Sequence, residues 1–443
     1  MFHRCRHRAA ALALVAGGLC VCDQVDAQPA LARVTGSGAV QPDALLRDAA
    51  LASGGDAVVF VSTASNLLPG GNDVENIYRY ELDSRALTRV SSAPGTNAPA
   101  DKICYAPAVS GDGKVVAFES FATNLVAGST QLNVFRRDLD TGAITRISDD
   151  GTGNEGNSQA RSPALSGDGR YTVFVSAASN LVFGDSNGMV DVFVHDAVTH
   201  TVSILSLNRF GQFADGSVEP LTPQAISSDG QRVVFSSRAN AMTPVNGNGL
   251  PQVYLLDRAT NTYTLLSHAP DGALGDGLSD QATISANGRF VAFRSTSGNL
   301  LPGSVNRVYR YDRQDGVLVN IPLPAAADFD PPLALSPIQC RYPRVTDAGD
   351  VLATCDFTSP APPQVFLWTA ASTRWRLVSH ALAGSSVFGD LRSGSASGIS
   401  ADGQRLAFDS QATDLVAGDT NATSDVMFDA EPRPDLIFRS GFE

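Results

Sequence analysis

Charged residues are scarce in this chain of 443 residues, and basic residues are the scarcer kind. Asp, Glu, Lys and Arg make up 17% of the sequence, below the roughly 25% of an average globular protein. Lys and Arg number 32 against 45 Asp and Glu, which gives a formal net charge of −13. A nucleic-acid binder needs clustered basic side chains that displace counterions from phosphates. No such cluster follows the first ten residues, so the sequence excludes a nucleic-acid partner.

Long apolar runs are also missing. No apolar run reaches the roughly 18 residues that a membrane-spanning helix requires, so we do not expect an integral membrane protein. Hydrophobic residues nevertheless make up 43% of the chain, which is too many for a disordered protein. We therefore expect a folded chain with a core.

The first 27 residues have the pattern of a secretory signal peptide. Arg4, Arg6 and Arg8 precede the apolar stretch 9–22, and Ala27 provides the small residue of a cleavage site. We expect removal of residues 1–27 and a periplasmic or secreted protein. A membrane anchor is the alternative, although the apolar stretch is short for a span.

Cysteine is nearly absent after this segment. Three of the six cysteines lie within it, which leaves Cys104, Cys340 and Cys355. An exported compartment permits disulfides, but three cysteines are too few for a disulfide framework, so the fold must rest on its core. Cys340 and Cys355 flank one predicted hairpin and are candidates for a disulfide. The alternative is that all three are small buried hydrophobic residues.

One motif recurs seven times along the remaining sequence. Its copy at 110–118 reads Ser-Gly-Asp-Gly-Lys-Val-Val-Ala-Phe, and the copy at 166–174 reads Ser-Gly-Asp-Gly-Arg-Tyr-Thr-Val-Phe. Asp-Gly between two strand-like runs is typical of a tight hairpin, because Gly adopts positive φ without steric cost. The copies begin near residues 52, 110, 166, 227, 285, 346 and 400.

Each copy continues with a second pair of strand-like runs. A Val-Phe or Val-Tyr run is usually followed by a turn that Asp opens, as at Asp138 and Asp196, and then by a last short run. Four-stranded units repeated around an axis form a β-propeller. We therefore predict an all-β, seven-bladed propeller over residues 28–430. Residues 431–443 would be a tail, either a sorting signal or a frayed end.

The ring requires a strand that joins the two ends of the chain. Residues 31–35, Leu-Ala-Arg-Val-Thr, match the fourth-strand run 87–91, Leu-Thr-Arg-Val-Ser, but precede the first complete repeat. We predict that they form the outer strand of the last blade. Residues 435–438 are the rival, which Pro432 and Pro434 disfavour because proline removes a ladder donor.

These repeats resemble the exported TolB-like, WD-type propeller repeats of bacteria. The resemblance rests on the Ser-x-Asp-Gly-x-x-Val-x-Phe motif and the Val-Phe-x-x-Asp third strands, and it covers residues 31–430. It implies the propeller fold and says little about function. The N-terminal α/β domain of TolB has no counterpart before the first repeat. Propeller-bearing peptidases carry an additional α/β-hydrolase domain, and the repeats leave no residues of this sequence for one.

One loop has the spacing of a metal site. Asp185, Asn187 and Asp191 supply oxygen atoms at positions 1, 3 and 7, a pattern that suits Ca²⁺. We expect the loop between the second and third strands of blade three. The alternative is that these side chains only cap the turn. Blade seven repeats the pattern with Asp419, Asn421 and Asp425.

Two histidines are candidates for a site on the rim of the channel. His268 and His380 each follow a fourth-strand serine, at positions that we expect to be equivalent in successive blades. Such a pair is suited to proton transfer or metal binding. Two ordinary surface histidines are the alternative.

Connections rich in Gly, Ser and Asn join the blades, for example 93–106, 150–162 and 208–222. Such loops often form the ligand face of a rigid scaffold. We expect a monomeric, non-enzymatic binding or scaffold module with an envelope protein or a glycan as its partner at this rim. Two alternatives stay open: a glycan lyase or hydrolase with a metal at the channel mouth, and a calcium-stabilised cell-surface module.

Overall fold

The computed structural model describes residues 31–35, 40–71, 73–245, 247–303, 307–325, 328–329, 337–358, 361–382, 387–421 and 423–429. Strands, turns and loops make up these residues, and no α-helix is present among them. In the same part of the chain, no helix is long and apolar enough to cross a membrane. The expected signal peptide, residues 1–27, and the expected tail, residues 431–443, lie outside the described residues.

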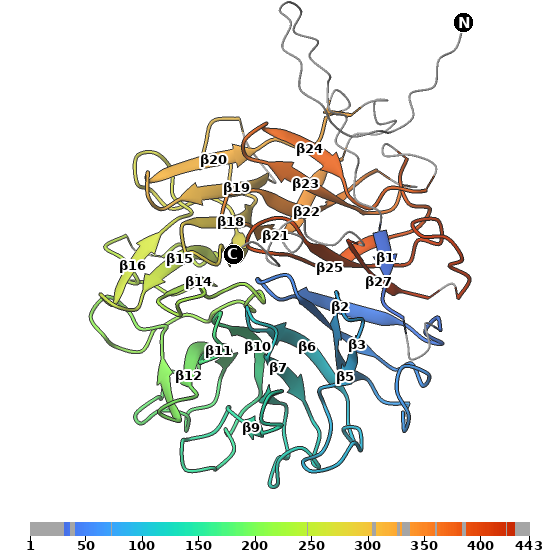
Figure 1. Cartoon of the computed structure of the whole chain (residues 1–443). Helices are drawn as coiled ribbons and strands as arrows, with labels where there is room; N and C mark the ends of the chain where they lie inside the picture. Colours follow the sequence, from blue (N-terminus) through green and yellow to red (C-terminus); the bar gives the residue numbers. More distant parts are fainter. Residues whose placement is uncertain are drawn as a thin grey trace, which may run out of the picture.

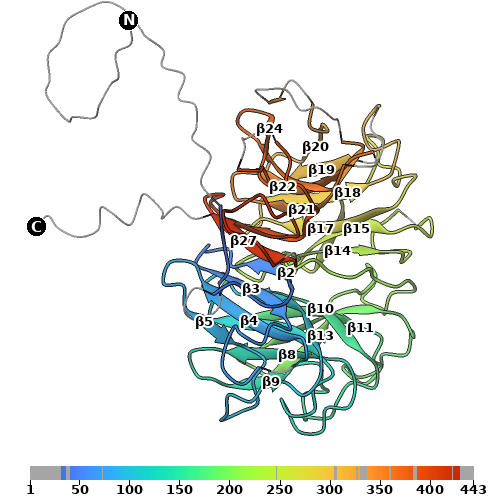
Figure 2. The same ribbon diagram turned by 90° about the vertical axis from the view of Figure 1, so that its right-hand side faces the viewer.

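Seven antiparallel sheets surround a central axis, as Figures 1 and 2 show from two directions. The first strand of each four-stranded sheet contacts the first strands of neighbouring sheets and is therefore the innermost strand. The chain is an all-β, seven-bladed propeller, which confirms the fold predicted from the repeat.

The first three blades follow the strand order predicted within each repeat. Blade one contains β2 (Leu46–Leu51), β3 (Ala57–Ser62), β4 (Asn76–Glu81) and β5 (Leu87–Arg89). Blade two contains β6 (Cys104–Val109), β7 (Val115–Ser120), β8 (Asn133–Asp138) and β9 (Ile144–Arg146). Blade three contains β10 (Ala160–Leu165), β11 (Tyr171–Ser176), β12 (Asp191–Asp196) and β13 (Thr201–Ile204).

The other four blades complete the ring. Blade four contains β14 (Arg232–Ser237), β15 (Gln252–Asp257) and β16 (Thr262–Leu265). Blade five contains β17 (Ser279–Ile284), β18 (Phe290–Ser295), β19 (Arg307–Asp312) and β20 (Val317–Ile321). Blade six contains β21 (Gln339–Val345), β22 (Val351–Asp356), β23 (Gln364–Thr369) and β24 (Arg374–Leu377). Blade seven contains β25 (Ser393–Ile399), β26 (Leu406–Ser410), β27 (Asp425–Asp429) and β1 (Leu31–Arg33).

The N-terminal strand closes the ring. β1 pairs antiparallel with β27, with Leu31 opposite Asp429 and Arg33 opposite Met427. The two strands lie side by side in Figure 1. The expectation that residues 31–35 complete the last blade is confirmed, and closure through hydrogen bonds joins the first and last parts of the chain.

Blade four departs from the predicted four strands. Its innermost position is taken by residues 218–226, which form only two isolated bridges, Val218 with Ser237 and Ile226 with Val233. Pro220 and Pro223 lie between these bridges and lack the N–H that a ladder requires. The segment therefore follows the path of a strand without regular pairing.

The recurrent motif forms the turn between the first two strands of a blade. In blade two, the Ser110 hydroxyl donates to Asp112 Oδ1 at 2.6 Å and accepts the Val115 N–H at 2.9 Å. Asp112 Oδ1 also accepts the Lys114 N–H, and Gly113 has φ 70°. The same serine contacts recur at Ser166, Ser227, Ser285 and Ser400. The motif is thus a hydrogen-bonded hairpin turn in these blades, as its sequence predicts.

Backbone hydrogen bonds connect these turns around the axis. Gly54 N–H donates to Gly111 O, and Gly167 N–H donates to Ser228 O. Three further bonds link the turns of blades four to five, six to seven, and seven to one: Ser228 to Ala286, Asp347 to Ala401, and Ala401 to Ser53. Blades five and six are joined by the Asn287 N–H and Asp347 Oδ1. We call this end of the propeller the turn face and the opposite end, with the second-to-third-strand loops and the inter-blade connections, the loop face.

The phenylalanine that ends the motif anchors the core of its blade. It stacks on an aromatic residue of the third strand in four blades, with ring centroids 5.6–5.9 Å apart. These pairs are Phe60 with Tyr78, Phe118 with Phe135, Phe174 with Phe193, and Phe293 with Tyr309. Burial of such rings is a main source of stability in a sheet core.

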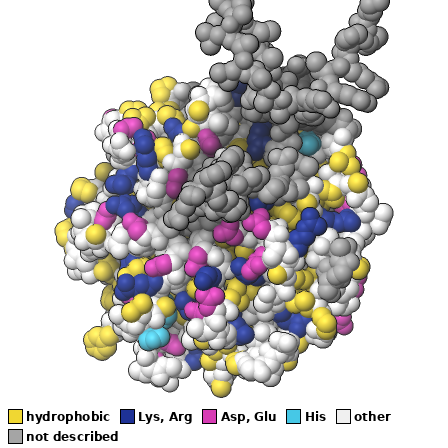
Figure 3. All heavy atoms as spheres, in the orientation of Figure 1, with side chains coloured by type: hydrophobic (Ala, Val, Ile, Leu, Met, Phe, Trp, Pro, Cys, Tyr) yellow, Lys and Arg dark blue, Asp and Glu magenta, His cyan; other side chains and the backbone are white. Residues whose placement is uncertain are grey.

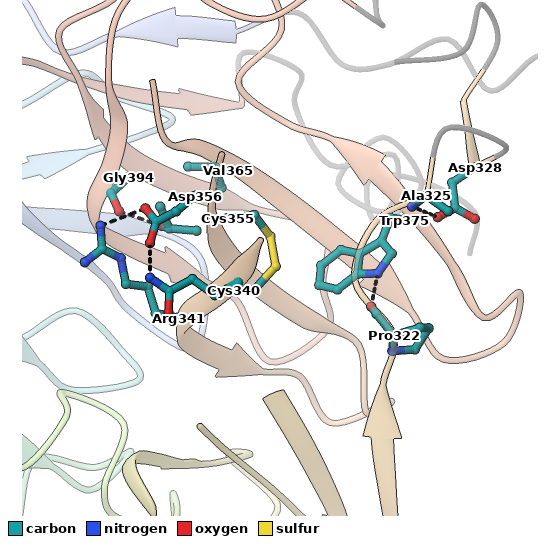
Figure 4. The surroundings of a disulfide bond; sticks show 12 residues. Pro322, Ala325, Asp328, Cys340, Arg341, Cys355, Asp356, Val365, Trp375 and Gly394 are labelled. Atoms are coloured by element: carbon teal, nitrogen blue, oxygen red, sulfur yellow. Dashed lines mark hydrogen bonds and ion pairs between the residues drawn. A yellow bond between two sulfur atoms is a disulfide. The ribbon is translucent and has the colours of Figure 1, made fainter. Parts of the chain in front are cut away.

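In blade six Thr354 replaces the motif phenylalanine, and a disulfide lies beside it. Cys340 of β21 and Cys355 of β22 are joined, as their positions flanking this hairpin suggested. Figure 4 shows the bond next to the pair formed by Arg341 and Asp356. Cys104 is a free, buried thiol.

The contact between turns predicts the effect of a single methyl group. A Cβ added at Gly54 would lie 2.4 Å from Gly111 O, the acceptor of the Gly54 N–H. We expect Gly54→Ala to lower the free energy of unfolding by about 1–3 kcal/mol, because the turns must separate. Chemical denaturation measures this loss. Ser53→Ala, which keeps the Ser53 carbonyl contact, is the matched control, and equal losses in the two variants would contradict the account.

Candidate binding site at the channel mouth

Six innermost strands are bulged near the loop face. The pairing of each with its second strand shifts register at the bulge. Five non-glycine residues there have φ between 47° and 56°, a conformation that costs about 1–3 kcal/mol each and often marks functional sites. These residues are Asp48, Ala106, Ser162, Gln281 and Tyr342, and Gly394, with φ 79°, lies within the bulge of blade seven.

Charged side chains of both signs surround the channel mouth next to these bulges. Arg238 and Glu219 are 2.8 Å apart in blade four, and Arg294 and Asp280 are 3.4 Å apart in blade five. In blade six, Arg341 and Asp356 lie 2.8 Å apart (Figure 4). In blade one, Arg47 pairs with Asp48 and Glu75. In each of these blades a basic group at the mouth has an acidic partner within the same blade.

Among the described residues, blades two and three lack such an ion pair at the mouth within one blade. Blade two has an acidic residue, Glu119, and blade three has a basic residue, Arg161. Glu119 lies opposite Tyr105 in blade two, and Arg161 lies opposite Val175 in blade three. Each charged residue therefore faces a residue without a formal charge in its own blade. Between the two blades, the Ser162 N–H donates a hydrogen bond of 2.6 Å to Glu119 Oε1.

Glu119 is the more buried of the two. Its side chain is 4% exposed. Burial raises its pKa from 4.5 to about 7, while the hydrogen bond from Ser162 and the charge of Arg161 act in the opposite direction. Burial, together with Glu119, also raises the pKa of Tyr105 to about 12. The carboxyl group of Glu119 can therefore exchange a proton close to neutral pH.

Arg161 is exposed and lines a pocket of about 230 Å³. Its Nη2 donates to Gln159 Oε1 at 2.6 Å. Among the described residues it forms no ion pair with a carboxylate. The walls of the pocket are mainly apolar and come from blade three and the start of blade four: Val175, Ala177, Val190, Val218 and Pro220. The site combines a cation, three amide or hydroxyl side chains (Ser158, Gln159 and Ser176) and an apolar surface, a combination typical of ligand pockets.

Sequence reasoning did not select Glu119, Arg161 or Tyr105. A weak signal was present, because Glu119 directly follows the motif phenylalanine, where blades one and three have Val61 and Val175. A charge at a half-buried strand position is informative only when its cross-strand neighbour is known, and the bulge changes that neighbour.

The first predicted metal loop lies on the loop face, between β11 and β12 as expected. Asn187 Oδ1 accepts the Met189 N–H, and its amide nitrogen donates to Asp191 Oδ2 at 2.8 Å. Asp191 Oδ1 accepts the Ser206 hydroxyl at 2.6 Å. Burial, together with the charge of Asp185, raises the pKa of Asp191 to about 6, while hydrogen bonds from Ser206 and Asn187 act in the opposite direction. These contacts correspond to the turn-capping alternative.

Other blades show the same structural role at the last position of the loop. Asn133 Oδ1 accepts the Ser148 hydroxyl, and Gln252 Oε1 accepts the Ser267 hydroxyl. Each serine lies two residues after the fourth strand of its blade. Asp191 is therefore one of several acceptors for this serine. Among the described residues, no group of three or more His, Cys, Asp and Glu has the arrangement of a metal site.

An arginine of β1 lies against the second predicted metal loop. Arg33 Nη1 of β1 lies 3.3 Å from Asp419 Oδ1 and 3.9 Å from Asp425 Oδ2. Asn421 donates to Pro42 O and, at 3.5 Å, to Asp425. A guanidinium group thus provides positive charge between these carboxylates. In blade three Ile204 stands in the equivalent fourth-strand position.

The two rim histidines do not lie in successive blades, which corrects the sequence-based expectation. His268 follows β16 of blade four and His380 follows β24 of blade six, so blade five separates them. The His268 Nδ1 lies 2.8 Å from Ala269 O, and the His380 Nδ1 lies 3.2 Å from Ala381 O. Each follows the outermost strand of its blade, and the structure does not bring the pair together.

No family model matches this sequence, and no curated protein is similar to it at the sequence level. Similar solved structures include oligogalacturonate lyase from Vibrio parahaemolyticus, with 11% identity, a TM-score of 0.51, and coverage of 91% of this chain and 94% of that chain. The β-propeller domain of the Trilobed protease from Pyrococcus furiosus has 13% identity, a TM-score of 0.51, and coverage of 90% and 98%.

TolB from Acinetobacter baumannii has 18% identity and a TM-score of 0.40 over 68% of this chain. This chain spans 58% of TolB. At such identities the likeness concerns the fold alone. The chain is a seven-bladed β-propeller with distant structural similarity to oligogalacturonate lyase and to a peptidase propeller domain.

Because the carboxyl group of Glu119 is buried, we expect the effect of Glu119→Gln on the free energy of unfolding to depend on pH. Folded Glu119 keeps its proton up to a pH of about 7, whereas its ordinary pKa is 4.5. Wild-type stability relative to Glu119→Gln therefore falls as pH rises between these values, by about 3 kcal/mol in total, and is constant outside them. Gln keeps an oxygen for the Ser162 N–H.

Urea denaturation from pH 4 to pH 9 measures this difference. Glu81→Gln is the control of opposite sign, because hydrogen bonds from Ser84 and Arg79 lower the pKa of Glu81. A difference between Glu119→Gln and wild type that does not change with pH would show that Glu119 titrates normally.

The calcium hypothesis for the loop 185–191 remains a prediction with a direct test. Bound calcium would raise Tm by mass action, and Asp185→Ala would abolish that rise. Asp419→Ala is the matched control, because Arg33 already lies against Asp419. Differential scanning calorimetry with Ca²⁺ and with chelator measures both. An identical response of Asp185→Ala and wild type would remove the loop from consideration.

Proposed function

We propose that the protein is a non-enzymatic binding module at the bacterial envelope or outside the cell, and that it holds an acidic group of a partner protein on its loop face. The observation that carries the proposal is Arg161, an exposed cation at the border of blades two and three. It lines an apolar-walled pocket and forms no ion pair with a described carboxylate.

The chemistry of the pocket favours a carboxylate as the group that is bound. A guanidinium group donates two parallel hydrogen bonds to a carboxylate, and Gln159 and Ser158 beside it supply further polar contacts. The apolar walls suit an aliphatic side chain next to that carboxylate. An acidic or C-terminal residue of a partner protein provides both features.

The charge pattern of the surface agrees with a short local contact. Acidic and basic side chains are interspersed over the face seen in Figure 3. At the channel mouth, four arginines other than Arg161 form ion pairs with acidic residues: Arg47, Arg238, Arg294 and Arg341. A field of one sign, which would attract a long polyanion, is not expected from this arrangement. Arg161, which forms no ion pair with a described carboxylate, instead suits a single acidic group.

The test first identifies a partner protein and then measures how Arg161 contributes to its binding. Residues 28–443 are used to capture proteins from envelope extract, and the enriched protein is purified and titrated by isothermal calorimetry. We expect Arg161→Met to weaken binding roughly 10- to 100-fold, the range for losing a charge-assisted hydrogen bond pair. Arg238→Met is the matched control, because Arg238 lies on the same face but pairs with Glu219.

Three results would contradict the proposal. Equal affinities of Arg161→Met and wild type would remove the arginine from the site. Binding of acidic oligosaccharides but of no envelope protein would change the class of partner to a glycan. Depolymerisation of such an oligosaccharide by the purified chain would favour the enzymatic alternative.

A further inference from the structure

The innermost strand of blade six carries a charge where the other blades have small residues. Arg344 stands two residues before the turn motif and is 7% exposed. The equivalent residues have small side chains or none: Ala50, Ala108, Ala164, Ala225, Thr283 and Gly398. One large cation therefore stands at a position where the other six blades have a small residue.

The hydrogen bonds of Arg344 do not balance its charge. Nε donates to Ser397 O at 3.1 Å, and Nη1 donates to Pro343 O at 2.9 Å. Both acceptors are neutral carbonyl groups. Burial lowers the pKa of Arg344 to about 10, so the group is still a cation at neutral pH. Among the described residues no carboxylate pairs with it, and a buried charge without a counterion is strongly unfavourable.

A small cavity lies at the axis beside this arginine. Its volume is about 40 Å³, and about 10–15 Å³ on this measure admits one water molecule. Gly111, Gly167 and Ser228 of the linked motif turns form part of its lining. It can hold one chloride-sized ion with a water molecule, whereas a sugar or a peptide side chain does not fit.

Two further polar groups line the same cavity. Ser397 is 1% exposed, and its hydroxyl has no hydrogen-bond partner among the described residues. The Gln224 amide nitrogen reaches Ile399 O of blade seven at 3.5 Å, a weak bond. A hydroxyl hydrogen and amide hydrogens are both donors, and donors beside an uncompensated cation form an anion site.

We propose that the axial cavity binds a small inorganic monovalent anion of the size of chloride, held by the Arg344 guanidinium and the Ser397 hydroxyl. The ion balances the positive charge of Arg344 and accepts a hydrogen bond from the Ser397 hydroxyl, which has no other partner among the described residues. It bridges blade six, which carries Arg344, and blade seven, which carries Ser397. This site is separate from the pocket at Arg161 and does not depend on the binding function proposed for the loop face.

Bromide is the probe for this site. Crystals of residues 28–443 grown in sodium bromide should give an anomalous peak on the axis between Arg344 and Ser397. In solution, Tm should be higher in sodium bromide than in sodium gluconate at equal ionic strength, because an ion that binds only the folded state stabilises it. Gluconate is too large for the cavity.

Comparison between variants separates this binding from general salt effects. Arg344→Met has similar volume without the charge and should fold, since apolar replacement of a buried charge is often tolerated. In this variant, the difference in Tm between sodium bromide and sodium gluconate should be smaller than in wild type, and the anomalous peak should be lost. Arg405→Met removes a buried arginine that pairs with Asp83 at 2.7 Å, and it should keep the salt difference.

Two results would overturn the proposal. One is the lack of a bromide peak at the axis of the wild-type crystal. The other is a salt difference in Tm that Arg344→Met leaves unchanged. If Arg344→Met does not fold, Ser397→Ala is the alternative variant, because it keeps the arginine. The proposal then predicts lower bromide occupancy at the axis in Ser397→Ala than in wild type, and equal occupancy would contradict it.

Discussion

The contact between neighbouring motif turns is the constraint on which the ring depends. Seven hairpins meet at one end of the axis, and backbone hydrogen bonds such as Gly54 to Gly111 and Ala401 to Ser53 hold adjacent turns together. The turns can approach this closely only because the second motif residue is usually small, as at Gly111 and Gly167. A Cβ at Gly167 would lie 1.7 Å from the Ser228 hydroxyl oxygen. Sequence variation is therefore restricted on the turn face.

The loop face has the freedom that the turn face lacks. The bulges of the innermost strands present charged side chains there, and most of these charges are balanced within one blade. Where one blade departs from this pattern, a charged group lacks an ion-pair partner in its own blade. Glu119 and Arg161 are charged residues of neighbouring blades, and neither has an ion-pair partner in its own blade. Arg344 is a cation at a position where the other blades have small residues. In a repeat protein, departure from the consensus is thus a physical guide to function.

The propeller was predictable because its determinants are local. The motif turn, the alternating strands and the fourth-strand match of residues 31–35 are visible within a few residues, and they gave seven blades and the closing strand. Blade four shows the limit: Pro220 and Pro223 are plain in the sequence, but their strand was not recognised as interrupted. The hairpin of blade six made Cys340 and Cys355 candidates for a disulfide, but the sequence left open that both were free and buried.

The candidate site was not predictable for the same reason. Glu119 meets Ser162, 43 residues away, and Arg33 meets Asp419 across the closure of the ring. The spacing of Asp185, Asn187 and Asp191 suggested a metal, but the repeat uses the last of these positions to accept a serine hydroxyl. His268 and His380 looked equivalent, and the order of the blades keeps them apart. Which side chains meet across blades is decided by ring geometry rather than by spacing in the chain.

Hydrogen–deuterium exchange of residues 28–443 with and without the captured partner tests the central claim most directly. The account predicts slower exchange on the loop face, in residues 158–162, 175–177 and 218–220, which border the pocket of Arg161. The motif turns at 110–114 and 166–170 should exchange at an unchanged rate. Protection confined to the turn face, with no change around Arg161, would contradict the assignment of the loop face as the binding surface.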